Sequence, residues 1–77
     1  MEKNLYDAPA AKLRVLKILG GSNLLKKLSV MGIYEGSLIE KKLGYKEGPV
    51  IVKVKNSEVA IGHSMSLKII VKEEKWK

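Results

Sequence analysis

Short runs of alternating apolar and polar residues dominate the chain and predict a mainly β fold. The clearest alternation lies at 49–55, where Val50, Val52 and Val54 share one face of a predicted strand and lysines lie on the other. Four further runs have the length and composition of strands, at 12–19, 37–43, 58–62 and 67–71. Residues 1–11 show no clear period, so we read them as an extended lead-in.

One stretch, Ser22–Gly36, has helical spacing instead. Leu24, Leu28 and Met31 recur at i, i+4 and i+7, with Leu25 beside them. This spacing predicts a short helix whose apolar stripe faces the core while its lysines face water. The helix is expected to close one end of the sheet.

Local signals predict both ends of this helix. Ser22 is placed to cap its start, and Gly32 stands where the backbone must turn into the left-handed region. Ile33 directly follows and can pack on Leu28, as it does in a Schellman motif. The signal for the end of the helix is stronger than the signal for its start.

The order of these elements predicts a small SH3-like barrel of five strands, with one short helix between the first two strands. An oligonucleotide-binding barrel also has five strands, but its helix usually falls between the third and fourth. The position of the helix therefore favours the SH3-like fold. With 77 residues, the chain has room for one domain, and we expect residues 1–77 to form it.

The charge of the chain is strongly basic, with 15 Lys and Arg against 8 Asp and Glu and a net charge of +7. This excess favours nucleic acid, acidic protein surfaces or anionic lipid without choosing among them. Water-facing strand positions hold a candidate basic face that would join Arg14: Lys41, Lys42, Lys53, Lys55, Lys68 and Lys72. The alternative interpretation is a solvated surface that protects the strand edges.

A nucleic-acid-binding β-barrel is therefore the alternative function. Single strands are held by aromatic side chains that stack on bases along a basic groove. Four aromatic residues are available, and no two share a predicted strand: Tyr6, Tyr34, Tyr45 and Trp76. The sequence thus offers no ready stacking platform.

Candidate catalytic and metal-binding chemistry is sparse. The chain has no cysteine, so disulfides and thiolate metal ligands are absent from the sequence. His63 lies beside Ser64 without an aspartate near in the chain, which does not match a catalytic triad. A metal site of His63 with carboxylates would lack the usual ligand spacing, and its candidate partners are Glu58, Glu73 and Glu74. We expect no enzymatic activity, no cofactor and no metal.

Several motifs, taken together, resemble the FeoA family of small ferrous-iron transport accessory proteins. The segment Leu28-Ser-Val-Met-Gly-Ile-Tyr-Glu-Gly36 is the most specific, and its marker positions are Leu28, Gly32, Ile33 and Gly36. Gly48-Pro-Val-Ile-Val-Lys-Val, Val59-Ala-Ile-Gly and Leu67-Lys-Ile-Ile-Val follow in the same order. The C-terminal SH3-like domain of iron-dependent repressors shares the pattern, but this chain has no helix-turn-helix segment.

The resemblance implies an SH3-like barrel, a cytoplasmic location and association with the ferrous-iron transporter FeoB at its cytoplasmic GTP-binding part. It implies no enzymatic activity. The absence of an apolar run of about 20 residues and of a signal peptide agrees with a cytoplasmic protein. We expect partner contacts at the exposed rim of the helix and its end, at Lys26, Lys27, Tyr34 and Glu35. Self-association of the chain stays open.

Overall fold

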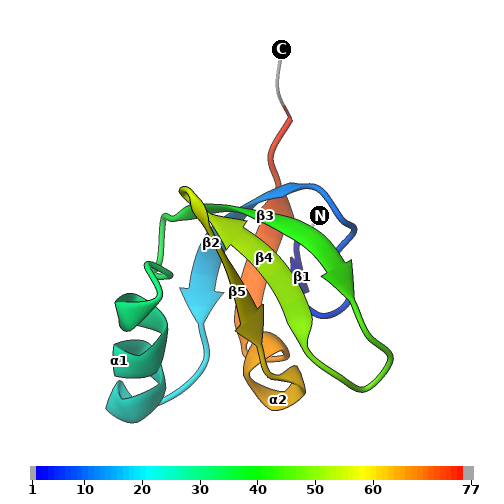
Figure 1. Ribbon diagram of the computed structural model, residues 1–77. Coiled ribbons are helices and arrows are strands. Elements are labelled where there is room, and N and C mark those ends of the chain that lie inside the picture. Colours follow the sequence, from blue (N-terminus) through cyan, green and yellow to red (C-terminus); the bar gives the residue numbers. More distant parts are fainter. Residues whose placement is uncertain (1, 76–77) are drawn as a thin grey trace.

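Six strands form one antiparallel sheet in the computed structural model, which describes residues 2–75 (Figure 1). In chain order they are β1 (Glu2–Asn4), β2 (Lys12–Ile18), β3 (Leu38–Gly44), β4 (Val50–Val54), β5 (Ser57–Ile61) and β6 (Ile69–Glu73). Their spatial order is β1-β6-β2-β3-β4-β5. The mainly β class is confirmed. The closed barrel of five strands is wrong, because within residues 2–75 the bent sheet ends at two edges, β1 and β5.

The additional strand is β1, which lies in the segment expected to be an extended lead-in. It is only three residues long and polar, so it carries no detectable alternation. Its pairing with β6 is non-local, with Glu2 opposite Lys72 and Asn4 opposite Ile70. The next residue, Leu5, continues this pairing, because its N–H donates to the carbonyl of Ile69 at 2.8 Å, and its side chain is fully buried.

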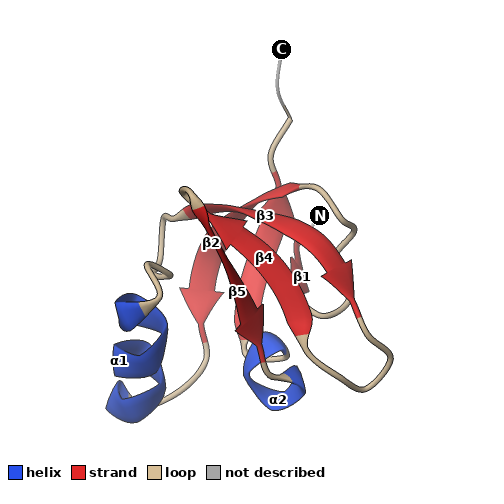
Figure 2. Ribbon diagram, in the orientation of Figure 1, coloured by secondary structure: helices blue, strands red, loops and turns tan. Residues whose placement is uncertain are grey.

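Two helices accompany the sheet within the described part of the chain, where the sequence predicted one. Helix α1 (Ser22–Val30) connects β2 to β3 and lies to one side of the sheet (Figure 2). Helix α2 (His63–Ser66) is a single turn between β5 and β6, at the place where the strand pattern is interrupted. Because β1 precedes β2, the longer helix falls between the second and third strands rather than between the first two.

The end of α1 has the predicted Schellman geometry. Gly32 has a φ of +82°, and its N–H donates to the carbonyl of Ser29 at 2.9 Å. The N–H of Ile33 donates to the carbonyl of Leu28 at 2.9 Å, and both side chains are fully buried in the core. The predicted cap at the start is wrong. Gly21 occupies the N-cap position and Ser22 is already helical, so no side chain caps the helix.

The apolar stripe of α1 is narrower than predicted. Leu28 alone is fully buried, while Leu24 and Met31 are partly buried against the core. Leu25 is 42% exposed. Because α1 packs beside the sheet and does not fill it, only one narrow line of its surface is covered, and the rest faces water.

The core lies inside the bend of the sheet and is built from the inward positions of the strands. Val50, Val52 and Val54 are buried on one face of β4, as their alternation predicts. The turn from β4 to β5 consists of Lys55 and Asn56, so β4 ends one residue before the predicted run at 49–55. Ser66, on α2, is also fully buried, and its hydroxyl donates to the carbonyl of His63 at 2.7 Å.

Candidate functional site

The outward side of α1 and its flanking residues expose several large apolar side chains. Val30 is 88% exposed at the last helical position, and Lys26, one turn earlier, is also exposed. Tyr34, just after the helix, is 51% exposed. We call this region the α1 surface, and its exposed residues are Leu19, Leu25, Lys26, Lys27, Val30 and Tyr34.

The segment that carries Tyr34 is held tightly by hydrogen bonds. The N–H of Tyr34 donates to the hydroxyl of Ser37 at 2.9 Å, and the N–H of Ser37 donates to the carbonyl of Tyr34 at 2.9 Å. Gly36 is fixed to β2 by its N–H, which donates to the carbonyl of Val15 at 2.8 Å. Its own carbonyl accepts from Nη1 of Arg14 at 3.0 Å. The exposed ring of Tyr34 is therefore presented by an ordered segment, which lowers the entropy cost of binding a partner.

Glu35 differs in orientation from the other predicted contact residues. Its Oε2 atom accepts a long hydrogen bond, 3.4 Å, from the N–H of Ile18 at the end of β2. Its carboxylate thus helps to hold the segment after α1 against the sheet. The structure brings Lys26, Lys27, Tyr34 and Glu35 to α1 and the segment after it; their contact with a partner stays a prediction.

Lys41 is the buried polar residue that sequence reasoning missed, since it was expected to face water. Only 7% of it is exposed, and Nζ donates to the carbonyl oxygens of Leu5 at 3.1 Å, Tyr6 at 2.8 Å and Ala8 at 2.7 Å. Burial lowers the pKa of Lys41, and the negative charge of Asp7 opposes that shift. Lys41 lies two positions after the buried Ile39 on β3, so the alternation of a strand was the signal that Lys41 points inward.

The outer face of the sheet is not uniformly basic. Strand pairing places Lys12 opposite Glu40, Glu40 opposite Lys53, and Lys53 opposite Glu58, so charges of opposite sign alternate across four strands. Glu40 also lies 3.8 Å from the ammonium of Lys42. Opposite charges on neighbouring strands stabilise a sheet modestly. The predicted continuous basic face is therefore interrupted by carboxylates.

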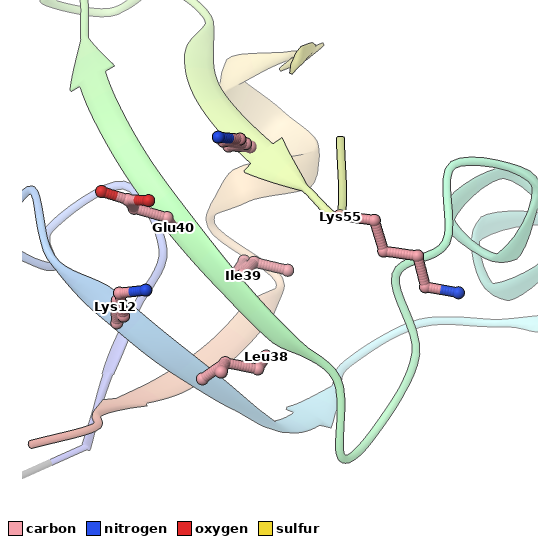
Figure 3. Close-up of a pocket in the computed structure, with 6 residues that line it drawn as sticks. Lys12, Leu38, Ile39, Glu40 and Lys55 are labelled. Atoms are coloured by element: carbon pink, nitrogen blue, oxygen red, sulfur yellow. The ribbon is translucent and has the colours of Figure 1, made fainter. Parts of the chain in front are cut away.

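A shallow pocket of about 240 Å³ opens on this face (Figure 3). Lys12 and Glu40 lie on neighbouring strands within it, and Lys55 points away from both. It is lined by Lys12, Leu38, Ile39, Glu40, Lys53 and Lys55. Arg14, which was expected to join the basic face, has Nε 3.2 Å from Oε1 of Glu74. The remaining lysines of the predicted face are exposed: Lys42, Lys53, Lys55, Lys68 and Lys72.

His63 packs against an aromatic ring instead of an acid and a hydroxyl. Its ring centroid lies 4.4 Å from that of Tyr6 in an edge-to-face arrangement. Across residues 2–75, no three His, Asp or Glu side chains gather in a group that could hold a metal ion. The same residues contain no helix that is long and apolar enough to cross a membrane. Trp76, the fourth candidate aromatic, lies outside the described residues.

Comparison with known proteins agrees with this architecture. The model of the FeoA domain matches residues 4–73. The Fe(2+) transport protein A of Methanocaldococcus jannaschii is 37% identical over 62 residues, which cover 80% of this chain and 74% of that protein. A crystal structure of the iron uptake regulatory protein FeoA superposes with a TM-score of 0.81 at 30% identity, over 94% of this chain and 96% of the other.

A longer protein shares the fold as one of its parts. The structure of ScaR with bound Zn²⁺ matches with a TM-score of 0.84 at 19% identity, over 94% of this chain and 37% of ScaR. At that identity the match shows the fold alone. The family model and the relative of 37% identity confirm the resemblance seen in the motif that ends α1. The chain belongs to the FeoA domain family.

Proposed function

We propose that this chain is a small cytoplasmic accessory protein of ferrous-iron uptake. It binds the cytoplasmic GTP-binding part of a FeoB-like membrane transporter and modulates transport through protein contacts, without catalysing a reaction. Membership of the FeoA domain family supports this function, as does the name of the Methanocaldococcus jannaschii relative. The membrane is reached only through the transporter.

The observation that carries the proposal is the α1 surface. A helix gains no stability from a valine side chain left in water, yet Val30 is 88% exposed. Two lysines lie within one helical turn of Val30, and an ordered tyrosine follows four residues later. Interface anchors are typically aromatic residues that require little reordering on binding. The surface fits a partner patch with an apolar centre and acidic groups around it.

A matched pair of variants tests this assignment. Tyr34→Ala with Lys27→Glu removes an exposed ring and reverses a charge on the α1 surface. Tyr45→Ala with Lys46→Glu makes the same changes in the connection between β3 and β4, where Tyr45 is 55% exposed. We expect the first variant to weaken binding to the transporter's cytoplasmic part by about tenfold or more, as for loss of an interface anchor. Equal binding by both variants in calorimetric titrations would refute the assignment.

A further inference from the structure

The two edges of the sheet are protected very differently. Strand β1 is three residues long, and two of them, Glu2 and Lys3, are charged and exposed. Strand β5 is five residues long and reads Ser-Glu-Val-Ala-Ile, with neither lysine nor proline. Proteins usually protect an exposed edge with lysine, proline, a bulge or a very short strand. β1 has such protection, and β5 has a single charge, on Glu58.

The register of the β4–β5 hairpin shows which backbone groups face outward. Its turn has two residues, and Val54 opposite Ser57 is the pair that closes it. In an antiparallel hairpin, hydrogen-bonded pairs alternate with pairs whose N–H and C=O groups point away. The backbone N–H and C=O groups of Glu58 and Ala60 therefore point to the free edge. Within residues 2–75, no strand lies against that edge.

We propose that this edge pairs, antiparallel, with β5 of a second copy of the chain, about a two-fold axis at Val59. Glu58 then lies opposite Ala60 of the second copy, and the two residues exchange both of their N–H···O=C bonds. By the two-fold symmetry, Ala60 of the first copy likewise lies opposite Glu58 of the second. The pairing is thus isologous, as the interface of a two-fold dimer requires.

Charge favours this edge and this register. The chain carries a net charge of +7, so two copies repel each other over most of their surfaces. Residues 57–61 contain one acidic and no basic side chain, so pairing of two copies at β5 brings no lysine or arginine of the edge strand itself against another. A register with Glu58 opposite its own copy would place like charges face to face, which destabilises a strand pair. The axis at Val59 offsets the two carboxylates.

Charge substitutions at Ala60 test both the edge and the register. Ala60 is exposed and its backbone does not bond to β4, so the folded chain tolerates a change there. Ala60→Lys places an ammonium opposite Glu58 of the second copy, and Ala60→Glu places a carboxylate there. We expect the dimer dissociation constant to fall about two- to thirtyfold for Ala60→Lys and to rise by a similar factor for Ala60→Glu. Ala60→Ser is the uncharged control.

If net charge alone determined dimer affinity, Ala60→Lys would weaken the dimer because it makes the chain more positive. Ala60→Glu would strengthen it because it makes the chain less positive. Sedimentation equilibrium of the three variants distinguishes the two orders. Amide exchange supplies a second readout, since the N–H groups of Glu58 and Ala60 should exchange about tenfold more slowly in concentrated than in dilute solution. A chain that stays monomeric in concentrated solution, the reverse order of affinities, or equal affinities would each overturn the proposal. None of these measurements involves the transporter.

Discussion

The ammonium nitrogen of Lys41 lies 2.7 Å from the carbonyl oxygen of Ala8, which joins β3 to the segment between β1 and β2. Two more carbonyls, of Leu5 and Tyr6, accept from the same nitrogen. All three protons of the ammonium are therefore used, which is the arrangement that a buried lysine requires. Lys41 thus helps to hold the N-terminal segment to the sheet, together with strand β1 and the buried side chain of Leu5.

Replacement of Lys41 by methionine should destabilise the fold. Lys41→Met keeps the length of the side chain but leaves the carbonyls of Leu5, Tyr6 and Ala8 without this donor. Unpaired buried acceptors cost about 1–3 kcal/mol, so we expect a loss of that size in the free energy of unfolding. Lys42→Met is the matched control, because Lys42 is exposed, and a change within about 0.5 kcal/mol is expected there. Urea denaturation measures both, and equal losses would contradict this role.

The lowered pKa of Lys41 predicts a dependence of stability on alkaline pH. Between the folded-state pKa and the ordinary value of 10.5, the unfolded chain binds the Lys41 proton more strongly than the folded chain. Deprotonation in this window therefore favours the folded state, and below the window the two states bind the proton equally. The free energy of unfolding of the wild type, relative to Lys41→Met, should rise as pH approaches 10.5. A relative decrease would mean that the carbonyls raise this pKa.

Gly32 and Gly36 both have positive φ, so alanine substitutions at the two positions distinguish the effect of backbone strain from that of side-chain contact. Gly32 has φ +82° and Gly36 has φ +94°, so alanine at either position is strained by about 1–2 kcal/mol. A Cβ atom at position 32 would also lie 3.1 Å from Cγ1 of Val54, whereas at position 36 it would meet nothing within 4 Å. Gly32→Ala should thus lower the thermal midpoint more than Gly36→Ala. A larger loss of thermal midpoint in Gly36→Ala would show that the close approach of Gly32 to Val54 does not add to the cost of substitution.

Loss of the Ser37 hydroxyl should weaken partner binding without changing the exposed surface. Ser37→Ala removes the acceptor for the N–H of Tyr34, a hydrogen bond worth about 1 kcal/mol. The ring then samples more positions before binding, so the affinity for the transporter's cytoplasmic part should fall severalfold. Ser29→Ala is the control, because its hydroxyl donates only to the carbonyl of Lys26 within α1. Unchanged affinity in Ser37→Ala would show that order in this segment does not contribute.

Features set by neighbouring residues were predictable from the sequence. The alternation of Val50, Val52 and Val54 and the stop at Gly32 both appear as expected, because each depends on local backbone geometry. Strand β1 was not predictable, since its pairing with β6 joins opposite ends of the chain and its residues are polar. The open edge at β5 likewise depends on the bend of the whole sheet.

The candidate site was predictable only in part, for the same physical reason. Lys26 and Lys27 are exposed where the helical pattern places them, and Tyr34 is exposed just after the helix. The apolar part of the α1 surface was missed, because Leu25 was assigned to the core by its residue type. Lys41 was missed for the converse reason, because a lysine is ordinarily expected to face water. Only the tertiary structure brings three carbonyls around its ammonium.

The central claim is that the α1 surface receives the transporter. Titration of the isotopically labelled chain with the transporter's cytoplasmic GTP-binding part, followed by backbone NMR shifts, tests it most directly. We expect the shifts to change at residues 25–37, with Val30 and Tyr34 among the most affected, while those of Tyr45 and Lys46 stay unchanged. Shifts confined to the β3–β4 connection, or no change at saturating partner, would contradict the account.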